Sequence, residues 1–379
     1  MAHIQVLEIL EAAAGGALRH LVQIAEHLDK DEFDLTLAVS PDRMARPERD
    51  IEQLRGLGAR VELVPMRRRP APVADLLAYR HLARLIREGR FDVVHAHSSK
   101  AGFLGRLAAR QTGVPRTFYT PHAFAFQCGG GAGWLYRQLE RAAARFGGTI
   151  VAVSESEKEL AVRHGIAPAD RIRVIRNAIP PPPEPTPDER AAARAALGLP
   201  SDALVVGTVG RLERQKGCVD LLRAAEHVVR EQSDARLVLI GPGTLEGPLT
   251  ELAKMLRISD QVTLTGHCDD PAGLYAAMDL YVQPSLWEGL PYAVLDAMGR
   301  GLPVVATDVP GNTDLVKDRA TGLLVPPGEP ANLADAIIGL LRDEGQRRAL
   351  GRAGRELVLR DHRLDDFVRS IEALYRGDQ

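Results

Sequence analysis

Residues 91–110, FDVVHAHSSKAGFLGRLAAR, join a short apolar run to a stretch whose apolar residues have helical spacing. A buried strand followed by an amphipathic helix is typical of a parallel sheet with crossover helices. The same pairing recurs through the first half of the chain. The strands expected there are residues 3–10, 33–39, 60–64, 91–95, 116–120 and 149–153, and the helices are 17–29, 72–88, 101–111 and 134–146.

Prolines interrupt this alternation at positions 180–187, in the sequence PPPPEPTP. Such a run fits neither a helix nor a central strand, so it predicts a stiff linker. The alternation then resumes. The second set of expected strands is 203–209, 236–240, 261–265, 279–283, 303–306 and 322–325, with helices at 217–231, 246–256, 291–299 and 331–342.

The pattern predicts an α/β protein with two doubly wound, Rossmann-like domains. We expect the first domain at residues 1–178, a proline-rich linker and connecting helix at 179–200, and the second domain at 201–355. A C-terminal helix is expected at 356–379. It either packs on its own domain or crosses back to the first.

The composition is that of a globular protein, with 45% hydrophobic and 26% charged residues in a chain of 379. The formal net charge is -2, yet residues 1–180 hold 26 Lys and Arg against 20 Asp and Glu. This basic half suits an anionic partner or membrane surface, although two solvated halves explain the difference as well. Aromatic residues make up 4% without a basic and aromatic stripe, so we expect no nucleic-acid binding.

The cysteines are widely spaced, which predicts neither a disulfide framework nor a zinc site and fits a reducing cytoplasm. The first residues, MAHIQVLEILE, lack the basic start of a signal peptide. No apolar run approaches the roughly 20 residues that span a bilayer. We therefore expect a cytoplasmic protein that contacts the inner face of the cell membrane only peripherally.

Charged residues follow two expected strands of the second half. Gly210 and Arg211 come after strand 203–209, and Lys216 and Gly217 open the next helix. A guanidinium and an ammonium group beside a helix N-terminus suit a diphosphate; two solvated loop cations are the alternative.

The sequence SLWEGLP, from Ser285 to Pro291, lies between strand 279–283 and helix 291–299. It places Glu288 at the carboxyl end of a strand, where ligands bind in doubly wound folds. Asp296 follows eight positions later. A carboxylate in this position accepts hydrogen bonds from sugar hydroxyls, or it is a solvated capping residue.

In the first half, Gly15 and Gly16 follow the first strand and open a helix. They suit close approach of an anion, though a tight turn explains them equally. His95 and His97 end one strand, and His122 ends the next. His95 and His97 share a strand face, but no third ligand follows at a recognisable spacing, so we expect no metal.

Together these motifs resemble the retaining GT-B glycosyltransferases of family 4. The motifs are Gly15-Gly16, H-x-H at 95–97, T-P-H at 120–122, the G-R and K-G pairs at 210–217, and Glu288 with Asp296. The resemblance implies two domains facing across a cleft, the first binding an acceptor and the second a nucleotide-sugar. UDP-sugars are the commonest donors in the family and GDP-mannose is next. The resemblance also implies front-face attack within an ion pair, with no metal and no cofactor.

The resemblance implies a role for each matching residue. Arg211 and Lys216 would neutralise the departing diphosphate, Glu288 would hold hydroxyls of the donor sugar, and His122 would contact that sugar near the reacting carbon. Asp296 stands where the family usually has a glutamate that binds ribose. The implied donor site is Gly15, Gly16, Gly210, Arg211, Lys216, Ser285, Glu288, Gly289, Leu290, Pro291 and Asp296.

The stretch HSSKAGFLGR at 97–106 resembles family members that build bacterial surface polysaccharides, whose acceptors are often sugars on polyprenyl diphosphate. The acceptor-side candidates are His97, Ser98, Ser99 and Lys100. We also expect residues 123–133, AFAFQCGGGAG, to form a mobile acceptor-side loop that orders on ligand binding.

Arginines recur at helical spacing in the first half, which predicts basic helix faces resting on an anionic membrane, unless these are solvated faces over the core. They are Arg80, Arg84 and Arg87 in one expected helix and Arg137, Arg141 and Arg145 in another; Arg67, Arg68 and Arg69 add a contiguous basic run.

Two other functions remain open from the sequence. One is a nucleotide-sugar 2-epimerase on the same fold, which needs further acid/base carboxylates; Glu11 is the candidate. The other is a catalytically silent protein that binds a sugar or a lipid.

Overall fold

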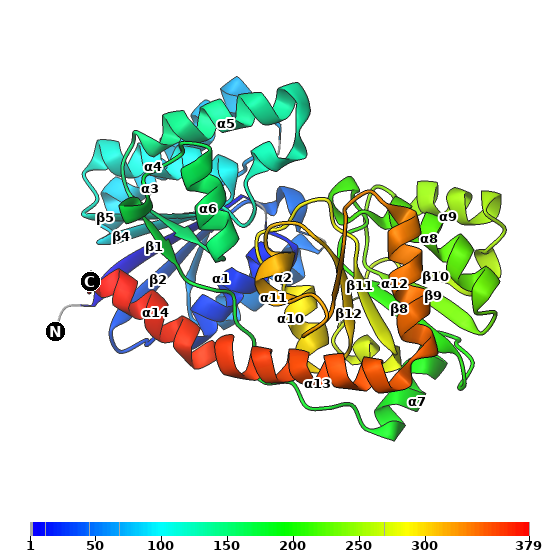
Figure 1. Cartoon of the computed structure of the whole chain (residues 1–379). Helices are drawn as coiled ribbons and strands as arrows, with labels where there is room; N and C mark the ends of the chain where they lie inside the picture. The colour runs from blue at the N-terminus through cyan, green and yellow to red at the C-terminus, as the bar shows by residue number, and fades with distance from the viewer. Residues whose placement is uncertain (1–2, 12, 45, 68, 269, 379) are drawn as a thin grey trace. The chain divides into compact units, whose positions relative to one another are not determined.

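The computed structural model describes residues 3–11, 13–44, 46–67, 69–268 and 270–378, which form two compact units. Unit 1 contains the chain up to Asn177 and the segment from Leu364 onward, and unit 2 is Ala178–Arg363. Each unit is a parallel sheet covered by helices (Figure 1). The predicted α/β fold with two doubly wound sheets is confirmed.

The sheet of unit 1 has the strand order β3-β2-β1-β4-β5-β6-β7. Its strands are β1 (Ile4–Leu10), β2 (Phe33–Val39), β3 (Arg60–Leu63), β4 (Val93–His97), β5 (Arg116–Thr120), β6 (Thr149–Ala152) and β7 (Ile172–Val174). Its helices are α1 (Gly15–His27), α2 (Pro47–Gly56), α3 (Pro72–Gly89), α4 (Ser99–Thr112), α5 (Gly130–Ala144), α6 (Glu155–Arg163) and α14 (Leu364–Arg376).

The two faces of this sheet differ in polarity. Leu7 and Ile9 of β1 join Val94 and Ala96 of β4 in an apolar core with α3 and α4. Glu8 alternates with these residues and pairs in register with His95, so both side chains belong to the opposite face. Helices α1 and α14 both contact β1 and each other.

The sheet of unit 2 has the order β10-β9-β8-β11-β12-β13. Its strands are β8 (Leu204–Val209), β9 (Ala235–Ile240), β10 (Val262–Leu264), β11 (Leu280–Gln283), β12 (Val304–Thr307) and β13 (Leu323–Val325). Its helices are α7 (Pro187–Ala196), α8 (Cys218–Glu231), α9 (Glu246–Met255), α10 (Tyr292–Gly299), α11 (Asn312–Leu315), α12 (Pro330–Arg342) and α13 (Glu344–Asp361). From β8 the chain continues outward to β9 and then β10, and it returns to the other side of β8 with β11, so the strand order reverses between β8 and β11. Ligands bind at such a reversal.

The segment expected as a linker, 179–200, clusters with unit 2. Thr186 and Glu189 form a reciprocal capping box at the start of α7. From the same helix, Arg194 Nη2 lies 2.8 Å from Asp279 Oδ2, and Arg190 also pairs with Asp279. These ion pairs fix α7 to the loop before β11.

The C-terminal part differs from the single helix expected at 356–379. Helix α13 ends at Asp361 and belongs to unit 2, whereas α14 starts at Leu364 and belongs to unit 1. No helix of the described part of the chain is long and apolar enough to cross a bilayer.

The expectation of a loop at 123–133 is wrong. Ala125–Cys128 form a short 3-10 helix, and α5 begins at Gly130. Phe124 and Phe126 are buried and their rings stack with centroids 5.0 Å apart. This aromatic pair supplies the core contact that outweighs the flexibility of the neighbouring glycines.

Candidate functional site

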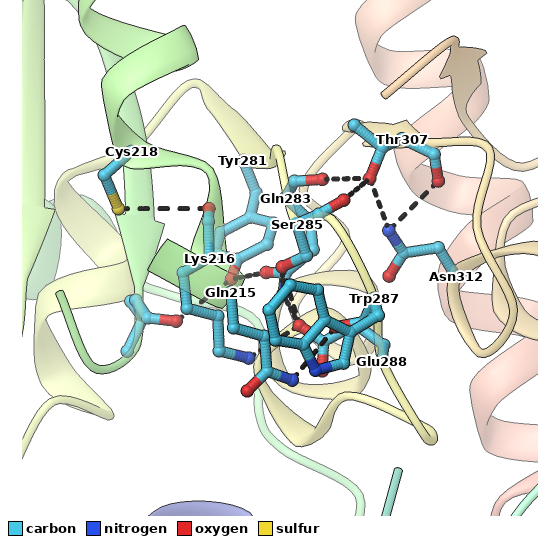
Figure 2. A network of polar contacts seen from close by, with 11 residues as sticks. Gln215, Lys216, Cys218, Tyr281, Gln283, Ser285, Trp287, Glu288, Thr307 and Asn312 are labelled. Atoms are coloured by element: carbon cyan, nitrogen blue, oxygen red, sulfur yellow. Dashed lines mark hydrogen bonds and ion pairs between the residues drawn. The ribbon is translucent and has the colours of Figure 1, made fainter. Parts of the chain in front are cut away.

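Lys216 and Glu288 meet beyond the carboxyl ends of β8 and β11 in unit 2 (Figure 2). Lys216 Nζ lies 2.6 Å from Glu288 Oε1. The two loops are held together by Gln215, whose Nε2 donates to the carbonyl of Trp287 at 2.9 Å. Gly217 has φ +63°, and a Cβ there would lie 1.9 Å from the carbonyl oxygen of Pro284. Only glycine allows this approach, which places the Lys216 side chain against Glu288.

Glu288 is buried, and its hydrogen bonds with described residues all end on one oxygen. Oε1 accepts from Lys216 Nζ, from Gln283 Nε2 at 2.7 Å and from Ser285 Oγ at 2.6 Å. Three donors on Oε1 hold the carboxylate in one orientation. Its Oε2 receives no hydrogen bond from a described residue and is the acceptor that a ligand hydroxyl would meet.

A buried layer fixes these donors in turn. Tyr281 OH donates to Gln283 Oε1 at 2.6 Å, so the Gln283 amide must turn its NH2 group toward Ser285 and Glu288. Burial raises the pKa of Tyr281, which keeps this hydroxyl protonated. Thr307 Oγ1 donates to the carbonyl of Ser285 at 2.5 Å, and Asn312 Nδ2 donates to the carbonyl of Thr307 at 3.0 Å (Figure 2).

These supporting residues were missed from the sequence. Gln283 and Thr307 are polar end residues of the otherwise apolar strands β11 and β12, and that polarity was the available signal. A narrow depression lies beside Gln283. It is lined by Thr208, Val209, Gly210, Leu212, Lys216, Cys218 and Gln283.

Unit 1 carries a second polar cluster, built from four histidines and Glu8. His97 Nε2 lies 2.5 Å from Glu8 Oε2, and His97 Nδ1 lies 3.0 Å from His122 Nε2. His95 Nε2 lies 2.8 Å from Thr120 Oγ1. The rings of His20 and His122 meet edge to face at 4.7 Å.

The environment keeps most of these imidazoles neutral. Burial, followed by the charge of His97, lowers the pKa of His20 to about 3. Burial and the neighbouring histidines also lower the pKa of His95 and of His122 well below the usual value. His122 is partly exposed, whereas His20, His95 and His97 are buried, so His122 is the member that a ligand can reach.

The structure brings side chains beside His95 and His97 that sequence spacing did not indicate. Ligand atoms of His20, His97 and His122 lie within 4.8 Å of one another, and so do those of Glu8, His95 and His97. Glu8 comes from β1 and His20 from α1, so sequence spacing could not reveal either. In the structure Glu8, His95 and His97 use their ligand atoms in the hydrogen bonds described above.

The acceptor-side candidates have different partners in unit 1. His97 joins the histidine cluster, whereas Ser98 Oγ donates to Glu11 Oε2 at 3.4 Å. The Ser99 side chain hydrogen-bonds Tyr119. Lys100 Nζ is held by Asp75 Oδ1 at 2.6 Å and by the carbonyl of Arg69 at 2.8 Å.

The glycine pair lies where the sequence indicated. Gly15 and Gly16 are exposed and begin α1, which has no side-chain cap at its N-terminus. Uncapped N–H groups at a helix start suit an anion.

The turns after β4 and β5 have unusual backbone angles. Ser98 has φ 68°, His122 φ 53° and Ala123 φ 80°. Such angles are unfavourable for residues with a Cβ and need support from their surroundings. Buried Glu157 supports the turn after β5: Oε1 accepts from the Ala123 N–H and Oε2 from the Val153 N–H, each at 2.8 Å.

The basic helix faces are partly confirmed. Arg80, Arg84 and Arg87 are exposed along α3. At α5, Arg145 is exposed, whereas Arg137 and Arg141 are partly exposed and both contact His164, to whose carbonyl Arg141 Nε donates at 2.9 Å. Arg68 lies outside the described residues.

Two protein-family models match the chain, one in each unit of the structure. The family model described as Glycosyl transferase 4-like domain matches residues 15–178, and Glycosyl transferases group 1 matches residues 189–357. A D-inositol 3-phosphate glycosyltransferase of Acidothermus cellulolyticus is 30% identical over 393 residues, covering 96% of this chain and 86% of that protein. The chain belongs to the glycosyl transferases group 1 family.

Other relatives of this glycosyltransferase extend the comparison. The chain is 28% identical over 351 residues to the UDP-Gal:alpha-D-GlcNAc-diphosphoundecaprenol alpha-1,3-galactosyltransferase of Escherichia coli, covering 91% of this chain and 88% of that protein. Anabaena HepE, solved in complex with UDP and glucose, has a TM-score of 0.85 and 21% identity, covering 99% of this chain and 100% of that chain. The predicted family and the GT-B fold are confirmed.

At α10 the structure differs from the sequence-based expectation in where the helix begins and in the partner of Asp296. Pro291 caps the helix, which begins at Tyr292. Asp296 Oδ1 lies 3.5 Å from Arg300 Nη1, so this carboxylate already has a cationic partner. Burial, and then the charges of Glu288 and Asp296, raise the pKa of Tyr281.

Proposed function

We propose that this glycosyltransferase moves a hexose from a UDP-sugar to a sugar on a polyprenyl diphosphate, or to a related glycan, with retention of configuration. Unit 2 binds the donor and unit 1 the acceptor. The observation that carries the proposal is the Glu288 carboxylate, held by three donors on Oε1 with Oε2 available to a sugar hydroxyl. The donor and acceptor classes are supported by the name of the Escherichia coli relative and by the UDP bound to HepE.

The donor's diphosphate is the group that Lys216 and Arg211 suit best. The Arg211 guanidinium makes no hydrogen bond or ion pair with any described residue, and Lys216 can exchange its partner Glu288 for a phosphate oxygen. Cations fixed in this way stabilise the charge that develops as the nucleoside diphosphate leaves. We propose that they do so without a metal ion.

The transfer step is then a substitution on one face of the sugar. The bond from the anomeric carbon to the diphosphate oxygen breaks, and the acceptor oxygen attacks the same face of the resulting ion pair. The acceptor's hydroxyl proton passes to the departing phosphate oxygen. His122, the partly exposed histidine, contacts the donor sugar near this carbon in our proposal.

A peripheral membrane contact fits the acceptor class. Helices α3 and α5 both pack against α4 and expose large apolar side chains in unit 1. Val73 is 76% exposed, Leu77 59% and Trp134 58%. Exposed apolar side chains can insert into a lipid layer, and the exposed arginines of α3 beside them can pair with anionic headgroups. We propose that these two helices carry the enzyme to its lipid-linked acceptor.

One incubation tests the function. The purified protein is mixed in EDTA with UDP-, GDP-, ADP- and TDP-sugars and a polyprenyl-linked acceptor extract, and mass spectrometry follows nucleotide and lipid. We expect release of UDP together with a hexose mass gain on the lipid. Conversion of the donor to an epimer would support the epimerase instead, and no release from any donor would overturn the proposal of an active transferase. Loss of transfer in EDTA that returns with Mg²⁺ would overturn metal independence alone.

A further inference from the structure

Glu8 is the ionisable side chain of β1, whose other residues are apolar except for Gln5 near its start. It is fully buried in β1, between Leu7 and Ile9, which pack into the core on the other face of the sheet. A buried carboxylate is costly unless donors surround it. Two are present: Tyr375 OH donates to Oε1 and His97 Nε2 to Oε2.

Tyr375, on α14, fixes the hydrogens on one side of this carboxylate. Burial, and then the charge of Glu8, raise the pKa of Tyr375, so its hydroxyl keeps its hydrogen and donates it to Glu8. The hydroxyl must therefore accept from His95 Nδ1, which lies 2.8 Å away. His95 Nε2 then accepts from Thr120 Oγ1. This chain fixes His95 as the Nδ1–H form.

The other side of the carboxylate leads to His122. A carboxylate only accepts hydrogen bonds, so His97 Nε2 carries a hydrogen and points it at Glu8. His97 Nδ1 and His122 Nε2, 3.0 Å apart, share one further hydrogen. Its place on one or the other nitrogen decides which face of His122 is a donor. Glu8 and His97 form an ion pair with both side chains fully buried, and a buried carboxylate is costly without a cationic partner, so this geometry favours the hydrogen on His97 Nδ1.

We infer that Glu8 is a positioning residue: it pairs with a protonated His97, whose Nδ1–H donates to His122 Nε2 and so leaves the hydrogen of neutral His122 on Nδ1. His122 then presents a donor, from the nitrogen that does not face His97, to an oxygen of the donor sugar. The inference rests on the proposed function of His122. The titratable groups that face this pair are Glu8 of β1, His95 of β4, His20 of α1 and Tyr375 of α14.

The direct test is the position of the hydrogen on His122. We would label the histidines with ¹⁵N, assign His122 by its loss in His122→Gln, and read the shifts of its two ring nitrogens at pH 7. We expect a protonated Nδ1 and an unprotonated Nε2. A hydrogen on Nε2 overturns the inference. This readout needs no turnover, so it stands apart from any failure to find the donor or the acceptor.

The kinetic test uses Glu8→Gln, which keeps the size of the side chain and removes the charge that pairs with His97. We expect kcat to fall by about 10- to 100-fold with the donor KM changed by less than about threefold. The acid limb of the pH profile should move up by about one pH unit, because an uncharged His97 no longer opposes protonation of His122. An acid limb that stays in place overturns the inference.

Two further variants separate positioning from loss of stability. Glu140→Gln also removes a buried carboxylate from unit 1, but from a group bound to Arg106 and Tyr119. It should lower stability and leave the acid limb unmoved. If Glu8→Gln does not fold, Tyr375→Phe removes one hydrogen bond to Glu8 and should shift the limb in the same direction by a smaller amount. His97→Asn, which keeps a donor toward His122, should retain more activity than His97→Leu; equal losses would contradict the relay.

Discussion

Lys216 and Glu288, the two residues proposed to hold the diphosphate and the sugar of one donor, are ion-paired with each other at 2.6 Å. Both are largely covered by protein, with 22% and 7% of their side chains exposed. Donor binding therefore replaces one charge pair with two separate contacts, and the loss of either residue leaves its partner uncompensated.

We predict that Lys216→Ala and Glu288→Ala each lower turnover by on the order of 10²-fold or more, because each removes a group that stabilises charge in the transition state. The turnover rates are obtained by measuring the release of free nucleotide with chromatography. Lys254→Ala is the matched control, since Lys254 forms an exposed pair with Glu251 on α9. Rates near those of the parent protein in both site variants would mean that the donor binds elsewhere.

Gln283→Leu should weaken both the site and the fold. The substitution leaves the buried Tyr281 hydroxyl with only the longer contact to the Val209 carbonyl, at 3.4 Å, and removes one donor from Glu288, at a cost of about 1–3 kcal/mol in the free energy of unfolding. Denaturant titration measures this loss, and the donor KM should rise in parallel. An unchanged unfolding free energy would show that water replaces the Gln283 amide without cost.

The stability of the protein should fall as the pH drops below about 6.5. The folded-state pKa of His20 is lowered from 6.5 to about 3, so the unfolded chain takes up a proton in this range and the folded chain does not. Acidification therefore lowers the free energy of unfolding, and His20 alone accounts for a loss of about 2 kcal/mol between pH 6.5 and pH 5. His95 and His122, also lowered, add in the same direction.

Denaturant titrations at pH 7.5 and pH 5 measure this slope. His20→Gln is the informative variant, because removal of the titrating group should reduce the slope whatever it does to the stability at pH 7.5. A slope identical to that of the parent protein would contradict the assignment to His20.

Ala123→Gly should stabilise the protein by about 0.5 kcal/mol. The residue has φ 80°, where a Cβ is strained, and the relief of that strain exceeds the added freedom of the unfolded chain. Thermal unfolding measures the change. Ala192→Gly, on the exposed side of α7, is the control with the opposite sign and should cost about 1 kcal/mol. Destabilisation by both substitutions would be evidence against strain at Ala123.

Trp134→Glu should reduce binding to membranes if α5 contacts lipid. Vesicle flotation with phosphatidylglycerol and phosphatidylethanolamine gives the bound fraction, and we expect at least a several-fold loss as an exposed indole is replaced by a like charge facing an anionic surface. Met255→Glu, at an equally exposed apolar residue of α9 in unit 2, is the control. If the parent protein does not float with vesicles, whether or not they contain anionic lipid, the membrane proposal is wrong.

The sheets were predictable because most strands are compact apolar runs beside a helix pattern. Strand β7 was not expected from the sequence, because Ile172–Val174 is short and the exposed Arg173 interrupts its apolar residues. Helix α2 was also not expected; its mean hydropathy is low and only Ile51 and Leu54 are buried. Tertiary packing, which a local pattern does not contain, forms both elements.

Some residues of the candidate sites could likewise be predicted from the sequence, and others could not. Lys216 and Glu288 were visible because they lie in loops directly after apolar strands. Glu8 and Tyr375 were not, since they are 367 positions apart and meet only through the packing of α14 on β1. Gln283 and Glu8 show what the sequence did offer: a polar residue inside a strand that is otherwise apolar marks a buried network, even when its partners are unknown.

The assignment of α14 to unit 1 has a consequence for biosynthesis. The ribosome makes β1, α1 and β4 first, and Tyr375 only after the whole of unit 2 has been translated. Until then the Glu8 carboxylate lacks the hydrogen bond from Tyr375, one of its two donors. Helix α14 also does not yet cover the face of the sheet that bears Glu8. Nascent chains should therefore carry a half-covered sheet face until translation ends, and the histidine cluster should reach its final arrangement last.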